Sequence, residues 1–263
     1  MSRCRDKAVF RTVGRAIHHF GMISHGDRIA VGLSGGKDSL TLMCALHERL
    51  SRIPIRYSLV AIYVDPGFED DPALLIQDYC KKMGYRLRVE HTNHGRQAHS
   101  KENRENPCFL CSRLRRKLLF ELAHELGCNK LALGHHMDDI IETLFLNMFY
   151  GGQISTMVPC QPFFGGKLTV IRPLAFLDES TISRFAENQG FPEFKNSCPT
   201  AKISKRHEIR KMLNTLYQTN SKIKGNIFRA MSHVKPDYLL GPPVPNSGLG
   251  SRNADGPRNG CKR

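Results

Sequence analysis

The amino-acid sequence predicts an α/β fold, a Rossmann-like parallel sheet with helices on both of its faces. Short apolar runs alternate with helical segments through the middle of the chain, and a glycine-rich turn directly follows the first run. Repeated strand–helix units give parallel strands, and ligands of such sheets bind at the carboxyl ends of the strands. With 263 residues, the chain is long enough for one such domain with smaller additions.

The elements expected before residue 92 are one helix followed by three strands with their connections. Val9, Val13 and Ile17 recur at helical spacing, so the basic N-terminus is expected to be a helix. Asp71 and Pro72 are expected to cap and to begin the helix after the second strand. In order, we expect a strand at 28–34, a helix at 40–50, a strand at 57–65, a helix at 70–84 and a strand at 85–91.

A polar loop interrupts this alternation at residues 92–107. It is longer than an ordinary connection between a strand and a helix, so we expect it to be either mobile or functional. Beyond it, the pattern predicts a helix at 109–126, a strand at 130–135 and a helix at 138–150.

Basic residues are in large excess, with a formal net charge of +15. Residues 202–235 read as two short helices and carry nine Lys or Arg against one acid, Glu208. A solvated helix face seldom carries charges of a single sign, so a polyanionic partner is expected. The predicted organisation is a basic helix in 1–25, the α/β domain with a cysteine-rich insertion in 26–201, basic helices in 202–235 and a disordered tail rich in Gly, Pro and Asn in 236–263.

Two classes of protein are disfavoured by composition. No apolar run approaches the roughly 20 residues that span a bilayer, and the N-terminus lacks the apolar core of a secretory signal. We therefore expect a cytoplasmic protein with no membrane partner. In that reducing setting, the nine cysteines indicate ligands, redox chemistry or core thiols rather than a disulfide framework.

The stretch GLSGGKDS at 32–39 follows the first predicted strand and opens a helix. Gly35 and Gly36 allow successive backbone N–H groups to converge, and the helix N-terminus adds its positive end, which together form an anion site. Ser34 and Ser39 add hydroxyl donors, and the spacing differs from that of the Walker loop. An unliganded glycine turn is the alternative, but six residues agree on a ligand.

Two charged residues specify the expected ligand of this 32–39 loop. Lys37 brings a mobile cation. Asp38 would repel a phosphate unless a cation lay between them, which suggests Mg²⁺ bridging Asp38 and a triphosphate.

A second motif, GHHMDDIIET at 134–143, follows the fourth predicted strand. It gathers the carboxylates of Asp138, Asp139 and Glu142 near a helix start, which suits metal or substrate positioning. The alternative is a capping Asp pair with an exposed Glu. His135 and His136 receive no role, because such histidines are more often structural.

Together these motifs resemble a known family. The SGGKDS loop resembles the PP-loop of the N-type ATP pyrophosphatases, and 134–143 looks like the GHxxDDxxET element of their tRNA-modifying branch. PCFLCSRLRR at 107–116 with a later Cys-Pro in NSCPT resembles tRNA 2-thiocytidine synthetases over residues 8–235. The resemblance implies that ATP adenylates a substrate oxygen with release of pyrophosphate, after which a nucleophile displaces AMP.

The resemblance also implies a [4Fe–4S] cluster on Cys108, Cys111 and Cys198. Three thiolates would leave one of the four irons open to carry sulfur. Zinc is the main metal alternative, although structural zinc usually has four protein ligands, and a metal-free persulfide relay is the other. The remaining cysteines are expected to pack (Cys44, Cys80 and Cys128) or to have no role (Cys4, Cys160 and Cys261). Thiouridine synthetases with paired zinc cysteines at both ends, and lysidine synthetases, are disfavoured.

On this resemblance, ATP lies in the 34–39 loop near Gly134, with its adenine near Ile62 and Tyr63 at the end of the second strand. Lys37 would neutralise the departing pyrophosphate. Asp38, with help from Asp139, would hold Mg²⁺. The residues implied for nucleotide binding are therefore Ser34, Gly35, Gly36, Lys37, Asp38, Ser39, Ile62, Tyr63 and Gly134.

The implied reaction is thiolation of tRNA at the C2 oxygen of a cytidine. The implied partners are tRNA and a sulfur donor such as a cysteine desulfurase, and a homodimer is one candidate assembly. Two rivals stay open. One is a thiolase of the same class that acts on another tRNA base or a small acceptor. The other is a non-enzymatic RNA-binding metal module, against which the intact 32–39 loop argues.

Overall fold

The computed structural model describes residues 2–68, 72–194, 198–199 and 204–240. The chain separates into two compact units, residues 1–223 and 224–263. The second unit contains α9 (Ile223–Ala230) and the short 3₁₀ helix η2 (Pro236–Tyr238). Most of the predicted tail, 241–263, lies outside the described residues.

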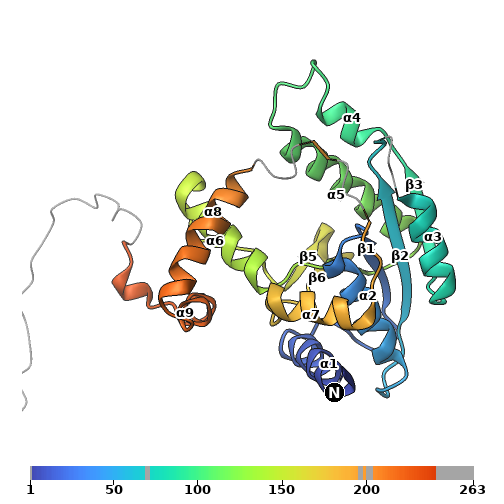
Figure 1. The fold of residues 1–263 in the computed structure, drawn as a ribbon, viewed down its shortest axis with the longest axis horizontal. Helices are drawn as coiled ribbons and strands as arrows, with labels where there is room; N and C mark the ends of the chain where they lie inside the picture. Colours follow the sequence, from blue (N-terminus) through green and yellow to red (C-terminus); the bar gives the residue numbers. More distant parts are fainter. Residues whose placement is uncertain (1, 69–71, 195–197, 200–203, 241–263) are drawn as a thin grey trace, which may run out of the picture. The chain divides into compact units, whose positions relative to one another are not determined.

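The first unit is built on a six-stranded sheet with the order β3-β2-β1-β4-β6-β5 (Figure 1). Five strands are parallel, and the edge strand β5 runs antiparallel to β6. The strands are β1 (Arg28–Leu33), β2 (Ser58–Asp65), β3 (Leu87–His91), β4 (Lys130–Ala132), β5 (Cys160–Phe163) and β6 (Leu168–Ile171). The strand order reverses between β1 and β4, so the crevice at their carboxyl ends is the expected ligand position.

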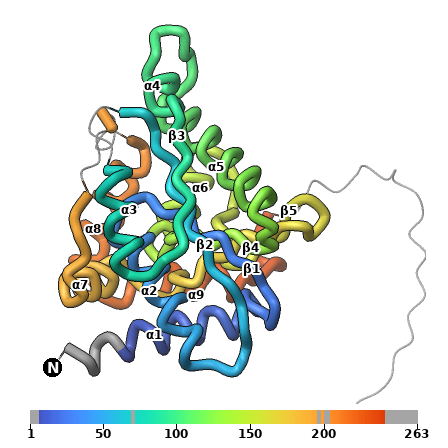
Figure 2. Tube along the Cα trace, turned by 90° about the vertical axis from the view of Figure 1, so that its right-hand side faces the viewer, coloured from blue at the N-terminus to red at the C-terminus, as the bar shows by residue number. Residues whose placement is uncertain are grey.

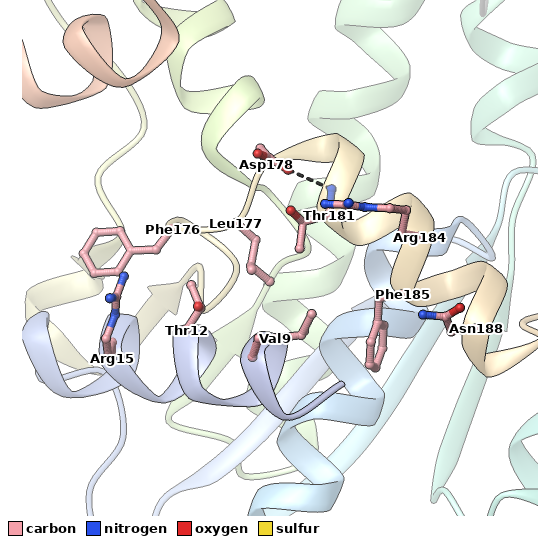
Figure 3. Close-up of a pocket in the computed structure, with 11 residues that line it drawn as sticks. Val9, Thr12, Arg15, Phe176, Leu177, Asp178, Thr181, Arg184, Phe185 and Asn188 are labelled. Atoms are coloured by element: carbon pink, nitrogen blue, oxygen red, sulfur yellow. Dashed lines mark hydrogen bonds between the residues drawn. The ribbon is translucent and has the colours of Figure 1, made fainter. Parts of the chain in front are cut away.

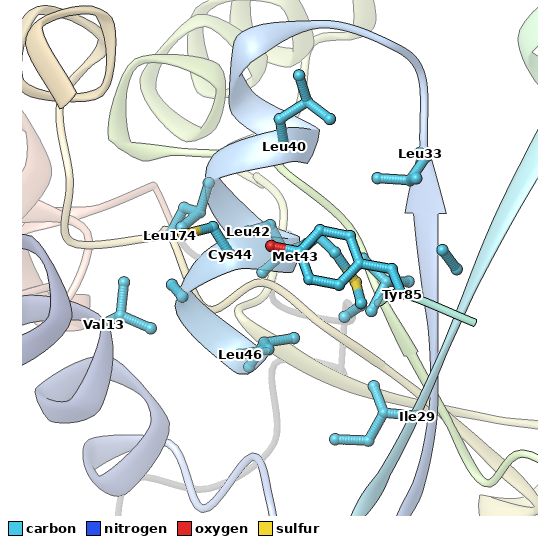
Figure 4. Close-up of a cluster of buried hydrophobic side chains, with 14 of the residues drawn as sticks. Val13, Ile29, Leu33, Leu40, Leu42, Met43, Cys44, Leu46, Tyr85 and Leu174 are labelled. Atoms are coloured by element: carbon cyan, nitrogen blue, oxygen red, sulfur yellow. The ribbon is translucent and has the colours of Figure 1, made fainter. Parts of the chain in front are cut away.

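Helices cover both faces of the sheet (Figures 1 and 2). Contacts join α1 (Ser2–His19), α2 (Lys37–Leu50) and α7 (Glu179–Gln189) on one side, while α5 (Pro107–Glu125) packs on β1, β2 and β4 on the other. Side chains of β2 alternate between these layers because successive residues of a strand point to opposite faces. Tyr63 belongs to the core beneath α2, shown in Figure 4, and Ile62 to the core beneath α5.

The predicted α/β fold with a parallel sheet is confirmed, and several details are new. The sequence pattern did not separate β5, β6 and α7 within 152–201. Pro72 is the N-cap of α3 (Ala73–Lys82) rather than its first residue, and the predicted cap Asp71 lies outside the described residues. The polar loop contains α4 (His94–Ala98), which packs on α5.

The two helices expected in 202–235 are α8 (Lys205–Thr219) and α9. Helix α8 belongs to the first unit and packs on α6 (Met137–Gly151). Across the described part of the chain, no helix is both long and apolar enough to cross a membrane.

Candidate active site

The 32–39 loop connects β1 to α2 and is fixed by its own hydrogen bonds. Gly35 takes a left-handed conformation (φ 76°), and Gly36 is the N-cap of α2. The Ser34 N–H donates to Ser39 Oγ at 3.1 Å, and Ser39 Oγ donates to the Gly36 carbonyl at 2.9 Å. The Ser39 hydroxyl therefore shapes the loop itself, a use that the sequence pattern did not predict.

Gly134 brings the end of β4 against the first turn of α2. A Cβ atom at this position would lie 3.1 Å from both the Asp38 carbonyl carbon and the Ser39 nitrogen. Such contacts with backbone cannot be relieved by moving a side chain. The absence of a side chain at Gly134 thus allows the 134–143 motif to meet the 32–39 loop.

His136 lies where the 134–143 motif meets the 32–39 loop. It is the N-cap of α6, and its side chain is only 3% exposed. Nε2 lies 3.9 Å from Asp38 Oδ1 and 3.4 Å from Asp139 Oδ2, and Nδ1 lies 3.6 Å from Asp138 Oδ2. Burial alone would lower the pKa of His136, but these three carboxylates outweigh burial and raise it. Sequence reasoning missed this role, and the only available signal was the position of His136 before the Asp pair.

Asp38 carries an oxygen that is suited to a cation. Its Oδ1 is buried and has no hydrogen-bond partner within the described residues. Burial raises the pKa of Asp38. The positive charges of His136 and Lys37 lower it but do not cancel the rise. Because a buried carboxylate oxygen without a donor is costly, Asp38 fits a bound Mg²⁺, and Asp139 approaches the same imidazole.

Lys37 is paired with a residue that sequence reasoning did not consider. Its Nζ lies 3.2 Å from Glu179 Oε1. The backbone N–H of Glu179, at the start of α7, donates to Asp138 Oδ2 at 2.8 Å. Burial lowers the pKa of Lys37, but Asp38 and Glu179 outweigh it, and the pKa is raised. Through Glu179, helix α7 therefore contacts one residue of each motif.

Two arginines of α8 neutralise the remaining carboxylates. Arg206 Nη1 lies 3.2 Å from Asp139 Oδ1 and 3.4 Å from Glu142 Oε2. Arg210 Nε lies 2.6 Å from Glu142 Oε1. The Glu142 side chain is 2% exposed, so the alternative of an exposed Glu at this position is wrong. Sequence reasoning placed both arginines only within a basic segment.

A pocket of about 490 Å³ opens beside the 32–39 loop. Its walls include Gly134 and His135 after β4, Asp139 in the first turn of α6, and Ser112, Arg115 and Arg116 from α5. Burial lowers the pKa of His135 to about 4, and its Nδ1 accepts a hydrogen bond from Arg172 Nε at 3.3 Å. A separate pocket of about 440 Å³ lies between α1 and α7, with Thr12, Phe176 and Arg184 in its walls (Figure 3).

Ile62 and Tyr63 do not line the pocket beside the 32–39 loop. Both are buried within the core, at 0% and 4% exposure, and Val64 of the same strand lines the pocket instead. The alternation of side chains along β2 places Tyr63 in the other layer, whereas Ile62 shares the face of Val64 but lies two residues farther from the carboxyl end of the strand.

The pair Cys108 and Cys111 lies in the first turns of α5. The Asn106 side chain caps this helix by accepting from the N–H groups of Cys108 and Phe109, and Pro107 is the first residue. Capping by Asn and an initial Pro are typical of a well-defined helix start. Local sequence therefore orients the two thiols.

Cys198 comes close enough to Cys111 to interact with it. The pKa of Cys111 is raised, chiefly by burial, while Arg115 opposes the rise and the nearby Cys198 and Cys108 add to it. The three thiols match the number of ligands that the resemblance implies for a cluster, and the influence on Cys111 indicates that Cys108 and Cys198 are its neighbours. Within the described ranges, no three His, Cys, Asp or Glu residues converge as ligands of a single metal ion. Cluster thiolates bind different irons and need not converge in that way.

A PP-loop domain model matches residues 9–216. The chain belongs to the PP-loop family. A curated tRNA-cytidine(32) 2-sulfurtransferase from Geobacter sulfurreducens is 42% identical over 240 residues, which cover 90% of this chain and 93% of the relative. A relative of the same name from Citrifermentans bemidjiense is 42% identical over 232 residues, covering 87% and 91%. The PP-loop family resemblance drawn from the motifs is confirmed, including its 2-thiocytidine synthetase branch.

Among solved structures, the U34-tRNA thiolase NcsA from Methanococcus maripaludis with its [4Fe–4S] cluster aligns with a TM-score of 0.74 and 26% identity. The alignment covers 92% of this PP-loop chain and 82% of that one. An NH3-dependent NAD synthetase from Campylobacter jejuni aligns with a TM-score of 0.50 and 13% identity, over 90% and 94% of the chains, and supports the fold alone.

Proposed function

We propose that the protein is an ATP-dependent tRNA sulfurtransferase that replaces the C2 oxygen of cytidine 32 with sulfur. One observation carries the proposal furthest. The pocket beside the PP-loop is lined on its other side by Ser112, Arg115 and Arg116, which belong to the helix that begins with Cys108 and Cys111. A nucleotide in the pocket would therefore lie beside the helix that bears the sulfur site. The position 32 comes from the relatives' names.

In the first step, the C2 oxygen of the cytidine would attack the α-phosphorus of ATP, and pyrophosphate would leave. Backbone N–H groups of the 32–39 loop would bind the phosphates, and Lys37 would stabilise the departing charge. Asp38 and Asp139 would hold Mg²⁺, and the supporting observation is that Asp38 Oδ1, although within ion-pair distance of Lys37 and His136, accepts no hydrogen bond within the described residues. His136 would keep these two carboxylates oriented.

In the second step, hydrosulfide would add to C2 and AMP would leave with the original oxygen. Arg115 and Arg116 line the pocket and would stabilise the negative charge of the departing phosphate. A [4Fe–4S] cluster held by Cys108, Cys111 and Cys198 would supply an iron with an open coordination position for sulfur. We infer that the ultimate sulfur donor is a separate enzyme of the cysteine desulfurase class.

Charge supports tRNA as the polyanionic partner. The net charge of +15 and the basic residues of α8 favour phosphate contacts. Such contacts give affinity and orientation rather than base choice, which the pocket must supply. Binding of tRNA is therefore expected to weaken steeply as salt rises.

The decisive experiment uses protein purified without oxygen, with ATP, Mg²⁺, sulfide and tRNA transcripts. We expect 2-thiocytidine at position 32 by nucleoside mass spectrometry, with one AMP and one pyrophosphate formed per thiolated base. A C32U transcript should lose the product. Thiolation at U34, or of free nucleosides, would favour the rival acceptors, and RNA binding without ATP turnover would favour the non-enzymatic module.

Iron content separates the two sulfur routes. We expect a brown protein with about four irons per chain, the number of a four-iron cluster. A colourless, iron-free preparation that thiolates tRNA at full rate would instead establish the persulfide relay.

A further inference from the structure

The C-terminal end of α6 carries exposed apolar side chains that the proposed chemistry does not use. Scattered exposed apolar residues are ordinary, but grouped ones mark interaction surfaces. Phe149 and Tyr150, which we call the α6 platform, are 53% and 55% exposed. The neighbouring exposed apolar residues are Met148 at 39%, Ile154 at 67% and Val158 at 51%.

The α6 platform is held rigidly. Gly152 ends α6 in a left-handed conformation (φ 59°). The Asn147 side-chain amide donates to the carbonyl and the hydroxyl oxygens of Ser155 at 2.9 Å and 3.0 Å, which fixes the following turn. The ring of Phe149 packs edge-on against Phe145, with centroids 5.5 Å apart. A surface fixed in this way loses little entropy when a flat partner binds.

A pair of opposite charges lies directly beside the platform, because Lys205 Nζ is 3.0 Å from Glu208 Oε1. The Lys205 ammonium is 5.5 Å from the centroid of the Tyr150 ring, and the Tyr150 hydroxyl donates to Glu208 Oε2 at 3.2 Å. Both partners are on α8, which also carries Lys211 facing solvent. Exposed aromatic rings bordered by cations are the usual surface for unpaired nucleotides, whose bases stack while their phosphates pair.

The chain returns from the platform to the nucleotide pocket. The Thr156 hydroxyl donates to the Ile140 carbonyl, which ties the returning loop to α6. Met157, the next residue, lines the pocket of about 490 Å³. Arg206, adjacent to Lys205, lines the same pocket. One short loop and one helical turn therefore join the platform to the pocket.

We propose that Phe149 and Tyr150 bind unpaired nucleotides of the substrate RNA by stacking, next to the base that enters the pocket. The inference rests on the proposed function. A base that reacts inside a pocket must leave its stack, so its neighbours lose a stacking partner. The α6 platform replaces that partner, and α8 binds the adjoining phosphates.

Replacing the rings tests this role against simple charge attraction. Phe149→Ala and Tyr150→Ala should each weaken tRNA binding about tenfold, since stacking contributes about 1–3 kcal/mol per base and 1.4 kcal/mol corresponds to tenfold. The slope of log Kd against log salt should not change, because no phosphate contact is lost. Lys211→Ala should instead reduce that slope by about one. Tyr150→Phe should retain most of the affinity.

A matched control replaces Phe164, which is 61% exposed outside the platform; Phe164→Ala should bind tRNA as the wild type does. An anticodon stem-loop with 2-aminopurine at position 33 should be quenched by the wild type and not by Tyr150→Ala. Unchanged affinity and quenching in both platform variants would overturn the proposal. A change of oligomeric state by light scattering would assign the platform to a protein contact instead. These binding measurements stand even if no base is thiolated, so failure of the proposed function would be seen separately.

Discussion

The 32–39 loop and the cysteine region of this protein are built in different ways. The loop is eight consecutive residues, and its hydrogen bonds run between Ser34, Gly36 and Ser39. The cysteine region combines a local pair, Cys108 and Cys111, with Cys198 from a distant part of the chain. Local hydrogen bonds determine the conformation of the 32–39 loop. In the cysteine region, only the tertiary fold brings Cys198 to the local pair.

The two regions also balance charge differently. Around the loop, carboxylates dominate and are neutralised by His136 and by two arginines of α8, while Glu179 of α7 pairs with Lys37. Around Cys111, burial raises the thiol pKa and Arg115 opposes that rise. The charges around the 32–39 loop suit a cation and a polyphosphate. The surroundings of Cys111 favour the thiolate form once a positively charged group binds there. We therefore expect that each of the two chemistries can be disabled without the other.

The largest expected effects separate the two regions. Lys37→Ala should slow pyrophosphate release about 10²–10³-fold, the usual loss when one group that stabilises developing charge is removed. Its iron content should match the wild type. Cys111→Ser should instead lose its iron and its thiolation activity and should bind ATP as the wild type does. Iron analysis and ATP binding measured on both variants check this, and loss of both properties in either variant would show that the two regions form one cooperative unit.

A smaller effect should show that even the loop depends on one tertiary contact. Gly134→Ala places a methyl group against the backbone of Asp38 and Ser39, and such overpacking costs about 1–3 kcal/mol. The affinity for ATP and the urea concentration at the midpoint of unfolding should both decrease. The control is Gly225→Ala, where a Cβ atom meets nothing within 4 Å, and it should leave both unchanged. Wild-type ATP affinity in Gly134→Ala would contradict the contact's importance.

The ion pairs between α6 and α8 should have an effect of similar size. Glu142→Gln removes a buried charge from Arg206 and Arg210 and should lower the free energy of unfolding by about 1–3 kcal/mol. Because Arg206 also contacts Asp139, ATP affinity should fall too. Glu208→Gln, whose side chain is 58% exposed, should not measurably change the thermal midpoint. Equal midpoints for the two variants would show that burial of Glu142 is unimportant.

The smallest expected effect concerns cysteines outside the two regions. Cys80 is 1% exposed, and burial raises its pKa to about 11; Cys128 is 7% exposed. Cys80→Ala should cost about 1 kcal/mol, which is typical of a buried substitution, and leave the iron content unchanged. Cys128→Ser should also retain its iron. Loss of the brown colour in either variant would show that the replaced cysteine belongs to the sulfur site.

Several parts of the molecule were predictable because they depend on local patterns. Apolar periodicity located β1, β2, β3 and the helices α2, α5 and α6, since each buries one face or stripe. The glycine-rich loop was predictable because its conformation depends on adjacent residues. The strands β5 and β6 were missed, since four residues each give too short a pattern to distinguish from loop.

By itself, the sequence determined the fold class, the family and the two motifs, because spacing and local hydrogen bonding are properties of neighbouring residues. The cations that neutralise Asp38, Asp139 and Glu142 depended on the tertiary structure, since His136 begins α6 whereas Arg206 and Arg210 belong to α8. The tertiary structure also buried the side chains of Ile62 and Tyr63, whose expected contact with adenine stays a prediction. Pairings between distant elements follow from how helices pack on the sheet, and no local pattern records that packing.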